Sequence, residues 1–152
     1  MSATGDPDPL ASVRVRRDEL YEAMLALERA VSVPARGRVA TWVAGVGDRL
    51  DELAAAWRDH IAGTEAPDGL FAEILDREPR LAHGVDRLRA SHVALSDSFD
   101  AAAVRLAATD DDAAVEKVRA ALLDLIHRLF EHRSYGAELV YEAYDVDLSA
   151  GD

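Results

Sequence analysis

Three of the five histidines occupy positions from which they could share one site. His60, His92 and His132 each continue a row of apolar residues spaced three and four apart, which is the spacing of one face of a helix. We therefore expect the three imidazoles to point into a helical bundle from three different helices. Neutral imidazole commonly ligates iron, zinc, copper and nickel, so this pattern indicates a metal site. The alternative is three core histidines that are hydrogen-bonded to carbonyls or carboxylates.

Four apolar rows predict the helices that carry these histidines. Prolines, glycines and polar turns divide the chain into long segments over about 10–33, 36–63, 79–108 and 112–144, with a short helix over 70–75. The rows are Leu20, Met24, Leu27 and Val31; Val39, Val43, Val46, Leu50, Leu53 and Trp57; Leu81, Val85, Leu88, Leu95 and Phe99; Val115, Val118, Leu122, Leu125, Leu129 and Leu139. None alternates as a strand would. The sequence predicts an all-α, up-down-up-down four-helix bundle, with the polar turn over 109–112 capping the last helix.

The length of 152 residues suits a single domain. We expect the bundle to occupy residues 10–144, after a disordered arm over 1–9 and before a frayed tail over 145–152. The arm has no apolar segment of the kind found in a signal peptide, so we expect a cytoplasmic protein. No run approaches 18 apolar residues, the length needed to cross a bilayer.

Composition excludes several classes of function. The 17 basic and 29 acidic residues give a net charge of -12, which repels phosphate backbones and anionic lipid, so we expect neither a nucleic-acid nor a membrane partner. The absence of cysteine excludes thiolate nucleophiles and thiolate zinc sites. No nucleophile–base pair can be placed, and we expect no enzyme. Gly45 and Gly47 lack a following dinucleotide fingerprint and are expected to permit a close helix approach or a local bend.

Axial position tests whether the histidines can meet. Counted from the turns that join the first helix to the second and the third to the fourth, His92 lies about 18 residues in, His132 about 22 and His60 about 26. At a rise of 1.5 Å per residue they span about 12 Å, which suits a dinuclear site, or two histidines on one ion, better than one ion held by all three. His83 and His127 lie two residues from row positions, and we expect them to face solvent or a helix flank.

Around the three histidines the chain resembles the hemerythrin-like (HHE) family. The similarity lies in His60-Ile-Ala-Gly-Thr-Glu65, in Arg89-Ala90-Ser91-His92 and in Leu129-Phe130-Glu131-His132. The resemblance implies a four-helix bundle with a non-haem di-iron centre, and the handling of oxygen, nitric oxide or iron. By this resemblance the metal ligands are His60, His92, His132 and Glu65.

Glu65 departs from an ideal ligand position. It lies five residues after His60, a rotation of about 140° on a regular helix, which turns it away from the inward face. The carboxylate reaches a metal bound by His60 only if the helix unwinds at Gly63.

The rest of the ligand set is shorter than the family's. The first segment contains no histidine, and Glu19, Tyr21 or Glu22 would have to replace it. Leu88 stands four residues before His92, where a second histidine is often found. Gly136 stands where an acidic ligand would be expected in the last segment. This set suits a reduced or mononuclear site, for iron or another metal, better than a full di-iron centre.

Two functions follow from these observations. The first is a hemerythrin-like protein that binds a metal and a small ligand such as oxygen or nitric oxide in the bundle interior. The second is a metal-free bundle that acts as an interaction or regulatory module, for which the acidic surface favours a basic protein partner.

Overall fold

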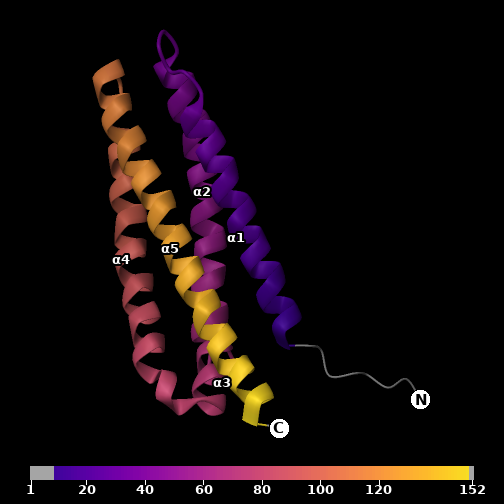
Figure 1. Ribbon diagram of the computed structural model, residues 1–152. Coiled ribbons are helices and arrows are strands. Elements are labelled where there is room, and N and C mark those ends of the chain that lie inside the picture. The colour runs from indigo at the N-terminus through magenta and orange to yellow at the C-terminus, as the bar shows by residue number, and fades with distance from the viewer. Residues whose placement is uncertain (1–8, 151–152) are drawn as a thin grey trace, which may run out of the picture.

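The computed structural model shows a helical chain (Figure 1). It describes residues 9–150, and the side chains of 11–144. The four long helices are α1 (Pro9–Ser32), α2 (Val39–Glu65), α4 (Ala82–Ala107) and α5 (Asp112–Ala150), and between α2 and α4 lie the short helix α3 (Leu70–Arg77) and a 3-10 turn (Pro79–Leu81). Residues 9–150 contain no strand, which confirms the predicted all-α class. The arm predicted over 1–9 lies outside the described residues except for Pro9, and so do the side chains of the predicted tail.

The long helices bury the predicted apolar rows against one another. In Figure 1, α1 lies along α2 and α4 along α5, and the α1–α2 and α4–α5 turns lie at the same end of the bundle. Leu27, Leu53 and Leu122 are fully buried members of three rows in one shared core. Within the described residues no helix is long and apolar enough to cross a membrane.

The helix ends follow from local chemistry. The α1–α2 turn contains Pro34 and Gly37, whose φ of 76° lies in the left-handed region that favours glycine. At the start of α5 the Asp111 carboxylate accepts a hydrogen bond from the backbone N–H of Ala114, at 2.7 Å. The polar turn therefore caps the last helix, as predicted.

A second core closes the end of the bundle opposite these turns. The short helix α3 buries Leu70, Phe71 and Ile74 against apolar residues of α4 and α5, among them Val85 and Leu139. The segment over 70–77 therefore covers the bundle interior with an apolar face rather than merely crossing a loop.

Two glycines are expected to respond oppositely to alanine. A Cβ on Gly45 would meet nothing within 4 Å, so no close helix approach occurs there and the expectation of one is wrong. Because glycine weakens a helix interior, Gly45→Ala should stabilise the fold by about 0.5–1 kcal/mol. A Cβ on Gly69 would overlap the backbone carbonyl oxygen of Gly63 and lie 2.9 Å from that of Thr64. Gly69→Ala should therefore destabilise the fold by about 1–3 kcal/mol.

Thermal unfolding of the two variants beside the wild type measures both effects. A change of 1 kcal/mol moves Tm by about 2–4 °C in a chain of this size. Equal shifts in the same direction would contradict the packing described at Gly69.

Candidate metal centre

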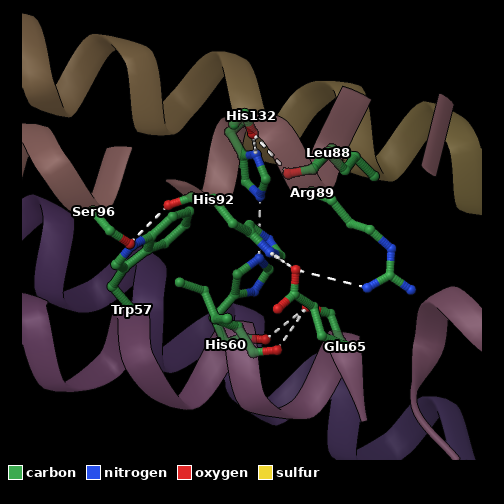
Figure 2. A network of polar contacts seen from close by, with 11 residues as sticks. Trp57, His60, Glu65, Leu88, Arg89, His92, Ser96 and His132 are labelled. Atoms are coloured by element: carbon green, nitrogen blue, oxygen red, sulfur yellow. Dashed lines mark hydrogen bonds and ion pairs between the residues drawn. The ribbon is translucent and has the colours of Figure 1, made fainter. Parts of the chain in front are cut away.

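The bundle brings the three predicted histidines together. His60 from α2, His92 from α4 and His132 from α5 place one ring nitrogen each within 4.8 Å of one another. The Nε2 atoms of His60 and His132 are 3.2 Å apart. Figure 2 shows the three imidazoles converging from separate helices. All three nitrogens are close enough to share one ion.

The ring nitrogens lie closer together than the predicted axial spread of about 12 Å suggests, for two physical reasons. The α1–α2 turn extends beyond the α4–α5 turn (Figure 1), which removes part of the extra distance to His60. Helical side chains also lean toward the N-terminus of their helix. His92 leans away from the turn at which α4 ends, whereas His60 and His132 lean toward the turns at which α2 and α5 begin. The rings therefore meet although their backbones differ in height.

Glu65 fixes the orientation of His92. Its Oε1 lies 3.2 Å from His92 Nδ1, the ring nitrogen on the far side from Nε2. Because an ionised carboxylate only accepts hydrogen bonds, Nδ1 carries the proton and Nε2 keeps its lone pair. That Nε2 is buried and has no hydrogen-bond partner.

Ser91 has the same effect on His132. The Ser91 hydroxyl donates to the backbone carbonyl of Leu88 at 3.1 Å, and its oxygen contacts His132 Nδ1. Since the hydroxyl proton is already used, the oxygen accepts the Nδ1–H of His132. The Nε2 lone pair of His132 is thereby presented to the cluster, the arrangement by which outer hydrogen bonds orient metal-binding histidines.

Aromatic rings hold the imidazoles in place. Trp57 stacks on His60, with ring centres 5.3 Å apart and an interplanar angle of 17°. Phe71 stacks on His92 at 5.4 Å and 18°. The Trp57 indole N–H donates to Ser96 Oγ at 3.0 Å, so the ring that contacts all three imidazoles is itself anchored. The histidines thus sit in a rigid and largely apolar surrounding.

The cluster is uncharged at neutral pH. Burial, followed by the neighbouring charges of His92 and Arg17, lowers the pKa of His60 to about 4. Burial, followed by His60 and His92, lowers the pKa of His132 to about 3. Burial also lowers the pKa of His92, against the opposing effect of Glu65. Neutral imidazole is the form that binds metal.

The predicted route of Glu65 to the metal is wrong. The helix does not unwind at Gly63 but continues to Glu65, and the carboxylate reaches the outer nitrogen of His92 instead of the cluster. The guanidinium of Arg16 lies against Gly63, where a Cβ would require this exposed side chain to move.

The remaining candidates stay outside the cluster. Glu19 and Glu22 are exposed, and Tyr21 packs edge-on against Phe130 at 6.0 Å. His83 and His127 are exposed, as predicted. Among the described residues only the three histidines form a group that could hold a metal ion.

This donor set does not fit the di-iron centre that the resemblance implies. Two irons require carboxylates beside the imidazoles, and the described part of the chain brings no carboxylate oxygen into the cluster. Three imidazole nitrogens fit one ion, as in protein sites that hold zinc with three ligands and leave a position open.

Residues that orient the site were partly visible in the sequence. Trp57 stands three residues before His60 on the same face, and Ser91 directly precedes His92, so both could have been proposed as neighbours. Nothing in the sequence placed Phe71, because the docking of α3 depends on tertiary packing.

A mainly apolar cavity adjoins the cluster between α1, α2, α3 and α5. The space in it that is open to the centre of a water-sized molecule is about 40 Å³. His60 and His132 form part of its wall, together with apolar side chains such as Leu20, Phe71 and Leu88. A small molecule in this cavity would therefore lie against two of the three histidines.

Comparisons of this chain with protein-family models, with curated proteins and with solved structures found no match. The function proposed next therefore depends on the geometry of the histidine cluster and on the resemblance noted in the sequence.

Proposed function

We propose that the chain binds one divalent transition-metal ion through the Nε2 atoms of His60, His92 and His132. Three neutral imidazoles suit zinc, iron(II), copper or nickel, and they leave coordination positions free. A free position beside the cavity would take a small ligand such as oxygen or nitric oxide. In this proposal the protein is a binding protein rather than a turnover enzyme.

The observation that carries the proposal is the state of His92 Nε2. This nitrogen is buried without a partner, although Glu65 holds the opposite side of the ring in place. An unsatisfied buried polar atom costs about 1–3 kcal/mol, and a native fold seldom keeps one without a reason. A metal ion would give this lone pair its partner.

The same proposal extends to the fold. An up-down-up-down order of the four long helices, similar to that of hemerythrin-like proteins, is supported by the shared end of the two helix turns (Figure 1). The short motifs around His60, His92 and His132 support it from the sequence. The ligand set, however, is reduced to three histidines and one ion.

Calorimetric titration of chelator-treated, untagged protein with zinc tests the proposal. We expect one ion per chain, and a Tm that rises with zinc because the ion binds only the folded state; at a hundred times Kd this linkage is worth about 2.7 kcal/mol. The matched control is the double variant His83→Ala/His127→Ala, which removes the two exposed histidines and should bind zinc as the wild type does.

Absence of zinc binding to the wild type, or loss of zinc binding in the His83→Ala/His127→Ala control, would overturn the proposal. The metal-free bundle that acts as an interaction module would then be the better account of the chain. Competition among zinc, iron(II), copper and nickel in the same assay identifies the preferred ion.

A further inference from the structure

The cavity beside the histidines has an unusual charge for this chain. Its lining includes the arginines Arg16, Arg17 and Arg133 and no aspartate or glutamate. The chain as a whole has 29 acidic residues against 17 basic ones. Positive charge is therefore concentrated at this cavity although the protein carries a net charge of -12.

These three arginines have no carboxylate partner. Within the described part of the chain Arg16, Arg17 and Arg133 form no ion pair, and the guanidinium of Arg133 lies over the ring of Tyr21, 4.5 Å from its centre. The Nε atom of Arg133 is buried and has no hydrogen-bond partner.

Arg17 and Arg133 also repel each other. Burial and then the charge of Arg133 lower the pKa of Arg17, and the neighbouring Asp18 offsets this only in part. Two half-buried guanidinium groups held together without an anion are unfavourable, so a bound anion would stabilise the arrangement.

The walls of the cavity restrict the kind of anion. Apart from the arginines and histidines the lining is mainly apolar, with Leu20, Leu70 and Phe71 among its residues. Such a lining stabilises a bound hydrocarbon group. Inorganic phosphate has no hydrocarbon part and would leave the apolar walls uncovered. The guanidinium group presents parallel N–H donors that match the two oxygens of a carboxylate.

We propose that this cavity binds a small organic carboxylate, with Arg17 and Arg133 holding the carboxylate group and the apolar walls holding a short hydrocarbon part. Binding of the carboxylate does not require the metal. The proposed function enters only in one respect: it places the bound carboxylate beside a coordinated metal ion, next to His60 and His132.

Calorimetry on metal-free protein with butyrate, acetate, butyramide and inorganic phosphate tests this inference. We expect butyrate to bind about tenfold or more tightly than butyramide, which has the same shape without the charge. Each methylene between acetate and butyrate should tighten binding by about fourfold. Arg17→Gln and Arg133→Gln should each weaken butyrate binding by about tenfold or more, and Arg49→Gln, an exposed arginine away from the cavity, should not.

Three results would overturn the inference. No binding of butyrate, equal binding of butyrate and butyramide, or binding of phosphate as tight as that of butyrate would each contradict it. Thermal unfolding of Arg17→Gln and Arg133→Gln shows whether a loss reflects the site or the fold, since only a folded variant with lost binding supports the proposal. Because the titration uses metal-free protein, failure to bind zinc leaves its outcome unaffected.

Discussion

Replacement of any one of the three clustered histidines by alanine is expected to lower zinc affinity by about a hundredfold or more. Changes in the residues that only orient a ligand typically cost about 10–100-fold, and removal of a ligand costs at least as much. His60→Ala, His92→Ala and His132→Ala should therefore behave alike, because their nitrogens lie within 4.8 Å of one another and, in the proposed site, would share one ion. Competition with a chromophoric chelator measures each affinity.

Substitution of the residues that orient the three histidines should give smaller losses of zinc affinity. Glu65→Gln keeps the shape but weakens the hold on His92 Nδ1, and Ser91→Ala removes the acceptor for His132 Nδ1. Each should weaken zinc binding by about tenfold or more. His127→Ala, which removes an exposed imidazole paired with Glu131 at 2.8 Å, is the control and should change little. Equal effects at His127 and His132 would contradict a site built on the cluster.

The free energy of unfolding of the metal-free protein is expected to fall steeply as the pH is lowered, because of the buried histidine cluster. The pKa values of His60 and His132 in the fold are about 4 and about 3, against 6.5 in the unfolded chain. Below pH 6.5 the unfolded chain therefore binds protons that the fold does not, so the free energy of unfolding decreases as pH falls. The contribution is fully present above pH 6.5 and is lost progressively toward pH 4 for His60 and toward pH 3 for His132.

The double variant His60→Leu/His132→Leu isolates this effect. Because it replaces both partners of a buried hydrogen bond by apolar groups, we expect the metal-free variant to be at least as stable as the wild type at pH 7.5. Below pH 6.5 its advantage should grow by up to about 1.4 kcal/mol per pH unit for each histidine removed.

Urea unfolding in the presence of a chelator, from pH 7.5 to pH 5, measures the difference. The double variant His83→Gln/His127→Gln, which removes two exposed imidazoles and leaves the buried cluster intact, serves as the control. Comparison at equal pH cancels the effect of the many surface carboxylates. Parallel curves for the wild type and the leucine variant would show that the cluster is not buried as described.

Much of the fold could be predicted because burial follows helical periodicity. Rows such as Leu20, Met24 and Leu27 occupy the core as expected, and the inward positions of His92 and His132 follow from the same spacing. Residue counting failed for the distance between the histidines, since it ignored the unequal extent of the two turns and the lean of helical side chains.

The chemistry of the site depended on contacts that spacing does not reveal. The resemblance implied that Glu65 is a ligand, yet its carboxylate lies against His92 of another helix. The stacking of Phe71 on His92, and the burial of Arg133 Nε without a hydrogen-bond partner, result from the docking of α3 and α5, which no local pattern encodes.

X-ray absorption of the zinc-loaded protein tests the central claim most directly, because it counts the ligands of the bound ion. We predict one zinc per chain with three imidazole nitrogens at about 2.0–2.1 Å and a ligand other than imidazole, such as water, completing the shell. A shell made of oxygen atoms alone, or one in which His92→Ala leaves the imidazole signal unchanged, would contradict the proposed site.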